Sequence, residues 1–147
     1  MLMKNTLKRK SPVFRINNRQ KKISINLSDI RKVFEGNSEF FSPPPQEIGV
    51  TIVSDRVIRK INRQFLEKDS STDVISFKMS RKYGEIIISA ETALKNSSVY
   101  GKTLEKEIIY LIVHGYLHLK NYRDYTPSEQ QKMLALQDDI FSGLTEK

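Results

Sequence analysis

The 147-residue chain carries 25 basic and 17 acidic residues, no cysteine and only two histidines. Its length fits one domain with a core of its own, and the lack of cysteine excludes a disulfide framework, a cysteine zinc site and a thiol nucleophile. No stretch is long and apolar enough to span a bilayer or to form the core of a secretory signal, so we expect a soluble, cytoplasmic protein.

The net charge of +8 comes from the N-terminus. Residues 1–22 hold eight basic residues and no acidic one, whereas the remaining 17 basic residues are matched by the 17 acidic ones. Such an arm favours a polyanionic partner, of which nucleic acid is the usual one. A flexible, merely solvated tail is the alternative for residues 1–11. We expect residues 12–147 to form a single domain.

The first expected elements are a strand and a helix. Residues 13–17 (VFRIN) alternate as a short strand does, and residues 21–25 could extend that strand or pair with it. The segment LSDIRKVFEG then has helical periodicity, with Asn26 or Ser28 as the N-cap and Gly36 as the stop.

The middle of the chain predicts a strand, a helix and a hairpin. Residues 47–53 (EIGVTIV) indicate a strand, after which Ser54 or Asp55 caps a helix. Residues 73–78 and 85–89 indicate two strands joined by a turn-prone segment, which is typical of a hairpin. The apolar stripe expected on the helix consists of Val57, Ile58, Ile61 and Phe65.

The last third of the chain has helical periodicity only, over residues 90–98, 104–119 and 128–141. Strands are early, helices are late, and a helix separates two of the early strands. The sequence therefore predicts an α+β domain in which a mixed sheet of about four strands packs against about five helices.

The two histidines, His114 and His118, are four residues apart in one of these helical segments. Positions i and i+4 share one helix face, about 6 Å apart along the axis, so two imidazoles can converge on one ion. Ordinary half-buried histidines are the alternative. Because the chain places its only two histidines at a chelating spacing, we favour a metal site.

A catalytic zinc site needs three protein ligands and an open position for water. Asn121 tolerates the left-handed conformation and is well placed to reverse the chain after the helix. Asp124 can then fold back and supply a carboxylate oxygen beside His118. The competitors in the last helix, whose spacing suggests a solvated face, are Asp138 and Asp139.

The residue after His114 excludes a familiar class of zinc protease. In those enzymes the residue after the first histidine is a glutamate that acts as general base, but here it is Gly115. A glycine inside a helix costs about 1 kcal/mol relative to alanine, which suggests the close approach of another backbone or of a ligand.

The segment HGYLHLKNYRD, residues 114–124, resembles the signature HGxLHLxGYDH of the YbeY family, bacterial metal-dependent endoribonucleases linked to ribosomal RNA maturation and ribosome quality control. INRQFLEKDSSTDVISF, residues 61–77, resembles that family's LNxxYRxxDxPTDVLSF. GEIIIS, residues 84–89, resembles its GDIxIS. The similarity extends over roughly residues 47–143.

Three positions depart from the family pattern. The third metal ligand is a histidine in the family and Asp124 here, which adds negative charge and makes a bound metal a weaker Lewis acid. The family's glycine after the helix is Asn121, a mild change. The family's functional arginine corresponds to Leu66, and Arg63, about one turn earlier, is a candidate substitute. The alternative for Arg63 is a solvated helix face made of Arg56, Arg59, Lys60 and Arg63.

The resemblance implies a hydrolase that cuts single-stranded RNA with one zinc-type ion held by His114, His118 and Asp124. A metal-activated water would attack the phosphodiester, RNA would approach along a basic groove, and His114 and Arg63 are the candidate catalytic residues. Two rivals remain open. One is a metal-dependent hydrolase of another substrate, and the other is a non-catalytic RNA- or ribosome-binding assembly factor with a structural metal, which Leu66 favours.

Overall fold

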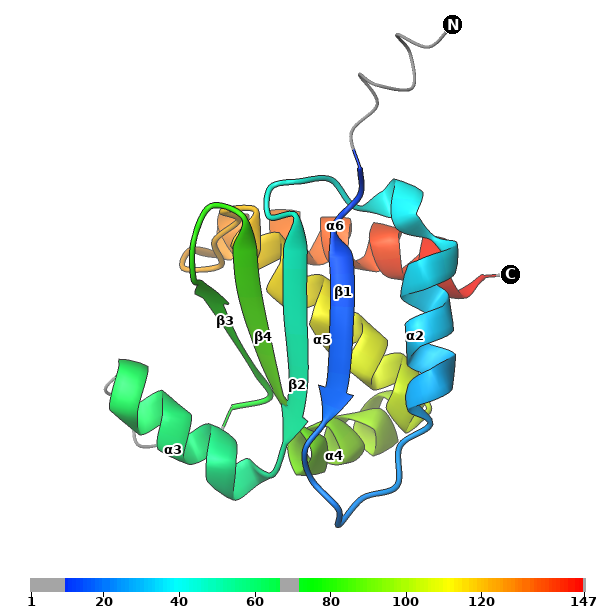
Figure 1. Cartoon of the computed structure of the whole chain (residues 1–147), viewed down its shortest axis with the longest axis vertical. Coiled ribbons are helices and arrows are strands. Elements are labelled where there is room, and N and C mark those ends of the chain that lie inside the picture. Colours follow the sequence, from blue (N-terminus) through cyan, green and yellow to red (C-terminus); the bar gives the residue numbers. More distant parts are fainter. Residues whose placement is uncertain (1–9, 67–71, 147) are drawn as a thin grey trace, which may run out of the picture.

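The computed structural model describes residues 10–66 and 72–146, which form one α+β domain (Figure 1). The elements in chain order are β1 (Val13–Asn18), α2 (Leu27–Gly36), a 3-10 turn (Ser38–Phe40), β2 (Glu47–Val53), α3 (Asp55–Leu66), β3 (Val74–Lys78), β4 (Tyr83–Ser89), α4 (Ala90–Tyr100), α5 (Leu104–Leu119) and α6 (Pro127–Thr145). The predicted class, a mixed sheet of four strands with five helices, is confirmed.

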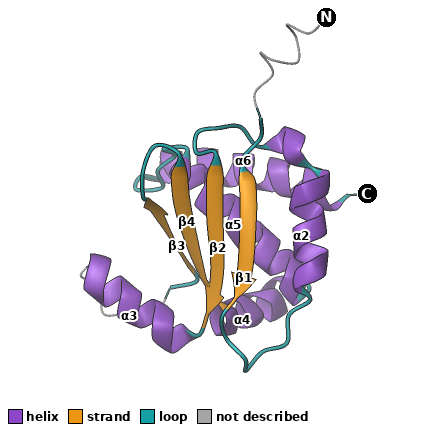
Figure 2. Ribbon diagram, viewed as in Figure 1, coloured by secondary structure: helices purple, strands orange, loops and turns teal. Residues whose placement is uncertain are grey.

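The sheet has the order β1-β2-β4-β3. β1, β2 and β4 run parallel, whereas β3 and β4 form the predicted antiparallel hairpin. The short β3–β4 turn fixes the hairpin locally, and the parallel pairs need helical crossovers to bring the chain back to the same edge. The result leaves β3 as an edge strand beside β4 (Figure 2).

Alternate residues of the strands face two separate apolar clusters. On β4, Ile86 and Ile88 belong to the main core with α2, α4, α5 and α6, while Ile87 packs into a smaller cluster with Ile58 of α3. The period of two along a strand sends neighbouring side chains to opposite faces. α5 and α3 therefore lie on opposite faces of the sheet, and α5 is the central helix of the larger core.

One expected strand segment is absent. Residues 21–25 neither extend β1 nor pair with it, because the Gln20 side chain closes a turn there. Its amide nitrogen donates to the Ile23 carbonyl at 2.8 Å, and its amide oxygen accepts from the Ile23 N–H at 2.9 Å. The expectation of a cap at Asn26 is confirmed, since its side chain accepts from the backbone of Asp29 at 3.2 Å.

The apolar stripe predicted on α3 is wrong in two of its four positions. Ile58 is fully buried and Ile61 is half-buried, but Val57 and Phe65 are 42% and 67% exposed. Asn62 is buried instead, at 3% exposure. α3 meets the sheet along a narrow row of side chains, because it is the only helix that the structure places on that face within residues 10–66 and 72–146.

The remaining helices agree with the sequence, although α4 and α6 extend two and four residues further at their C-terminal ends than the periodicity indicated. None of the described helices has the length and hydropathy needed to cross a membrane. Most of the basic N-terminal arm lies outside the described residues, so the boundary proposed between arm and domain stays a prediction.

Candidate metal centre

The C-terminal half of α5 carries both histidines on one face. His114 and His118 are half-buried, and their Nε2 atoms lie 3.1 Å apart. The rings are nearly perpendicular, at 80°. Helical spacing therefore does bring the two imidazoles together, as the sequence predicted.

The loop after α5 returns Asp124 to this pair. α5 ends at Leu119, and Asn121 takes the left-handed conformation with φ of 73°, as the sequence suggested. The Asp124 carboxylate then lies 3.6 Å from Nε2 of His118 and 4.0 Å from Nε2 of His114. His114, His118 and Asp124 form a group that could hold a metal ion, with all three ligand atoms within 4.8 Å of one another.

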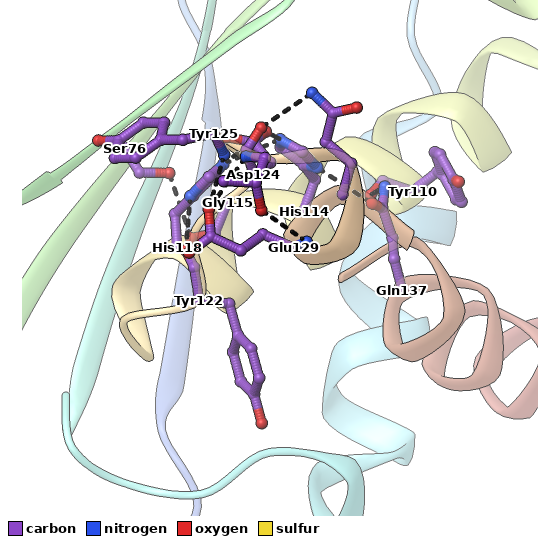
Figure 3. A network of polar contacts seen from close by, with 12 residues as sticks. Ser76, Tyr110, His114, Gly115, His118, Tyr122, Asp124, Tyr125, Glu129 and Gln137 are labelled. Atoms are coloured by element: carbon purple, nitrogen blue, oxygen red, sulfur yellow. Dashed lines mark hydrogen bonds and ion pairs between the residues drawn. The ribbon is translucent and has the colours of Figure 1, made fainter. Parts of the chain in front are cut away.

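Hydrogen bonds on the far side of each ring fix which nitrogen faces this centre (Figure 3). Nδ1 of His118 lies 3.0 Å from the Tyr122 carbonyl, which can only accept, so Nδ1 carries the proton. Nδ1 of His114 lies 3.0 Å from the Gln137 side-chain oxygen. The Gln137 amide group donates to the Tyr110 carbonyl at 3.2 Å, which sets the orientation of the amide and makes Nδ1 of His114 a donor.

Both Nε2 atoms are consequently unprotonated acceptors when the rings are neutral, and they face each other at 3.1 Å. Burial, with a further contribution from His114, lowers the pKa of His118, although Asp124 and the Tyr122 carbonyl oppose the shift. Neutral imidazole is the metal-binding form. Two lone pairs at this distance repel unless a cation or a proton lies between them.

The spacing of the three ligand atoms fits a tetrahedral ion. Two ligands bound at about 2.0–2.1 Å with a tetrahedral angle are separated by about 3.4 Å, close to the observed 3.1, 3.6 and 4.0 Å. Each histidine is also supported by a hydrogen bond behind it, the arrangement typical of metal-ligating histidines. The donor set and its geometry therefore suit a zinc-type cation.

Gly115 brings this end of α5 against the sheet. A Cβ at this position would lie 2.8 Å from Cγ2 of Ile86. The sequence suggested that a backbone or ligand approaches here, but the neighbour is the Ile86 side chain of β4. Beside it, the Ser76 hydroxyl donates to the Gly115 carbonyl at 3.1 Å. Ser76 therefore helps to hold the helix that carries the histidines.

The other candidate residues lie elsewhere. Asp138 accepts a hydrogen bond from the Tyr110 hydroxyl at 2.9 Å, and neither it nor Asp139 joins a group that could hold a metal among the residues that the structure describes. Arg63 is exposed on α3, which packs on the sheet face opposite α5. Leu66 ends the same helix and is 44% exposed.

Sequence reasoning missed Gln137, the residue that orients His114. Gln137 is only 4% exposed in α6, whose buried residues are Met133, Gln137 and Leu144. A polar residue in line with an apolar stripe was the available signal, because a buried amide must find hydrogen-bond partners. The Tyr122 carbonyl left no such signal, since it is a backbone group of the loop.

Comparisons with known proteins identify a family. The family model for endoribonuclease YbeY matches residues 15–145. The endoribonuclease YbeY of Geobacter metallireducens is 35% identical over 141 residues, covering 88% of this chain and 93% of that protein. That of Bacillus velezensis is 34% identical over 137 residues, covering 81% and 87% of the two chains.

A solved structure supports the fold. The solution structure of TM1509 from Thermotoga maritima is similar to this chain with a TM-score of 0.64 and 26% sequence identity, covering 90% of this chain and 89% of that one. Together with the family match over residues 15–145, these similarities show that the chain belongs to the endoribonuclease YbeY family.

Proposed function

We propose that this member of the family is a metal-dependent endoribonuclease specific for single-stranded RNA, which acts in ribosomal RNA maturation and ribosome quality control in the cytoplasm. Its ligands for one zinc ion are His114, His118 and Asp124. The observation that carries the proposal is the pair of Nε2 atoms at 3.1 Å, each made an acceptor by the hydrogen bond behind its ring.

An ion bound at this centre would supply a Lewis acid and lower the pKa of a coordinated water to about 7. The chain's own residues position that chemistry. Gln137 and the Tyr122 carbonyl keep both rings in the tautomer that binds metal. His114 is both a ligand and the candidate catalytic residue, and Asp124 contributes the negative charge that the family's histidine lacks.

A basic surface beside the centre supports RNA as the substrate. One hollow is lined by Lys78, Arg81 and Lys120 together with Asn121, which lies in the loop between α5 and Asp124. Arg81 also lines a second hollow with Lys10 and Lys82, so the two adjoin. Among residues 10–66 and 72–146, no acidic residue lines either hollow. Clustered cations without acids attract phosphates and release their counterions, which makes binding salt-dependent.

Arg63 is the second catalytic residue of the proposal. It would bind an RNA phosphate in place of the arginine that Leu66 replaces, from the sheet face opposite α5, and its support is its charge and its exposure on α3. An Arg63→Ala variant should lower the RNA cleavage rate by about 10-fold or more, as the loss of a phosphate-stabilising charge does. Arg56→Ala on the same helix is the matched control. Full activity of Arg63→Ala would mean that Arg63 is part of a solvated face of α3 and has no catalytic role.

The proposed function is tested with purified protein of measured metal content and a labelled single-stranded RNA. We expect cleavage by the full chain and its loss in an Asp124→Ala variant and after treatment with EDTA. Cleavage that survives both changes would refute the metal mechanism. One bound metal per chain with no cleavage would instead favour the assembly factor with a structural metal, in keeping with Leu66 at the arginine position.

A further inference from the structure

The residue that follows Asp124 is an exposed aromatic. Tyr125 is 79% exposed, the highest value among the large hydrophobic residues that the structure describes as exposed. An aromatic ring in water gives up the favourable burial of its apolar surface. An aromatic residue left in water one position from a candidate metal ligand is therefore a candidate contact for a ligand of that centre.

The loop holds Tyr125 firmly despite this exposure. The Glu129 carboxylate accepts from the backbone N–H groups of Tyr125 at 3.2 Å and Thr126 at 3.1 Å, and it is the N3 residue of the capping box that begins α6. The Gln130 side chain donates to the Asp124 carbonyl at 3.0 Å. Because the backbone on both sides of the ring is fixed, a partner that meets the ring would not need to order the loop first.

Neighbouring side chains of the loop point to different sides. The Asp124 carboxylate faces the two histidines, at 3.6 and 4.0 Å from their Nε2 atoms. Arg123 and Tyr125 are both exposed, and the guanidinium carbon of Arg123 lies 5.7 Å from the centre of the Tyr125 ring. The same guanidinium pairs with the Glu129 carboxylate at 3.1 Å. The loop thus offers the Asp124 carboxylate to the metal centre and the Tyr125 ring to solvent. Both residues are labelled in Figure 3.

That pairing suits one class of ligand. Nucleobases of single-stranded RNA stack on aromatic side chains whatever their sequence, and the plane of an arginine guanidinium can also stack on a base. Consecutive Cα atoms are about 3.8 Å apart, so a single strand held at the triad passes close to the backbone from which the Tyr125 ring extends.

We propose that Tyr125 is the stacking platform for a nucleobase next to the phosphodiester held at the metal centre, so that it positions single-stranded RNA for cleavage. This inference rests on the proposed function, because it takes RNA as the ligand of the same centre. It adds a residue that neither chelates metal nor carries charge.

The first test compares RNA affinity by fluorescence anisotropy of a labelled single strand with the full, metal-loaded chain, and gel electrophoresis checks that the strand is intact at each reading. Tyr125→Ala should weaken binding about 10-fold, the scale of one lost base stack, whereas Tyr125→Phe should bind like the unmodified chain. The matched control is Tyr100→Ala, since Tyr100 is 68% exposed at the end of α4. Tyr125→Ala binding within twofold of the unmodified chain would overturn the proposal.

The second test separates stacking from a structural role. RNA containing 5-iodouridine is crosslinked to the protein at low light dose, and the modified peptide is identified by mass spectrometry. An adduct on Tyr125 and not on Tyr100 is expected, and equal modification of the two would overturn the inference. If the chain fails to cleave RNA but Tyr125 still governs binding and crosslinking, the proposed function fails alone. If the chain cleaves RNA but Tyr125 changes neither, only the stacking role fails.

Discussion

The two ends of α5 both hold polar groups away from water, but they satisfy them differently. Near the N-terminal end, Glu107 is 2% exposed, and its carboxylate accepts from the Lys102 ammonium at 3.2 Å. The same ammonium lies 3.6 Å from the centre of the Tyr110 ring. Near the C-terminal end, the nitrogens of His114 and His118 meet as two acceptors. The first group, the closed cluster of Lys102, Glu107 and Tyr110, is complete within the chain. The second, the open cluster of His114, His118 and Asp124, needs a cation or a proton between its nitrogens.

This difference separates a structural cluster from a functional one better than burial does. Burial raises the pKa of Glu107 and lowers that of His118, so both groups are perturbed by the same cause. The Glu107 carboxylate has an ammonium as its partner, whereas the two unprotonated Nε2 atoms and the Asp124 carboxylate of the open cluster are all acceptors. The position along the helix adds to the contrast, because a helix favours anions at its N-terminus and cations at its C-terminus.

Removing a metal ligand from the open cluster should have the largest effect, which is a loss of metal affinity. We expect His118→Ala to lower zinc affinity by more than about 100-fold, because loss of a ligand exceeds the loss of a group behind it. Metal content after dialysis against a weak chelator measures this. Glu107→Gln, at the other end of α5, is the control and should keep its metal. Full metal occupancy in His118→Ala would exclude the triad as the metal centre.

Removing the Lys102 ammonium should destabilise the closed cluster. Lys102→Met leaves the Glu107 carboxylate buried without its partner, which we expect to cost about 3 kcal/mol of unfolding free energy. Urea denaturation measures the change, and Lys106→Met, which removes an exposed lysine of α5, should cost little. Equal stability of the two variants would mean that the Lys102–Glu107 pair contributes nothing to the fold.

The same variant has a defined pH dependence. Folding raises the pKa of Glu107 above its ordinary value of 4.5, so its contribution to stability is present below that value and is lost as the pH rises through the folded pKa. Without Lys102 the folded pKa rises further. The deficit of Lys102→Met should therefore shrink when urea denaturation is repeated at lower pH, and a deficit that grows on acidification would contradict this assignment.

The sequence predicted the open cluster more completely than the closed one. The i, i+4 histidines and the asparagine at the helix end were enough to anticipate how His114, His118 and Asp124 meet, because each of those steps is local along the chain. Lys102 and Glu107 of the closed cluster are only five residues apart, but no motif in the sequence indicates that the segment between α4 and α5 turns the Lys102 ammonium back onto α5. Local patterns also did not indicate that Gln137 reaches His114 from α6. The apolar periodicity of α3 did not indicate how little of that helix the sheet covers.

The hydrogen bond between Nδ1 of His114 and Gln137 allows a test of how much a group behind a ligand contributes to metal affinity. Gln137→Leu keeps the approximate size of the side chain but leaves Nδ1 of His114 without its acceptor. We expect zinc affinity to fall about 10-fold, the lower end for loss of such a supporting group. Competition with a chromophoric chelator measures the affinity. Asp138→Asn, which alters the Tyr110 hydroxyl contact instead, is the control. Equal zinc affinities of the two variants would mean that Gln137 does not support metal binding.

The smallest expected effect concerns the contact between Gly115 and Ile86, which holds the C-terminal half of α5 against the sheet. In Gly115→Ala the new Cβ would lie 2.8 Å from Cγ2 of Ile86. Overpacking of this kind costs about 1–3 kcal/mol, and the better helix propensity of alanine returns about 1 kcal/mol, so we expect a net loss of about 1 kcal/mol. Urea denaturation of Gly115→Ala alone and combined with Ile86→Val measures it. Ile86→Val should give back part of the loss, because it removes Cδ1, which would lie 2.9 Å from the new Cβ, while it keeps Cγ2. If the double variant loses the full sum of the two separate changes, the glycine serves another purpose than admitting Ile86.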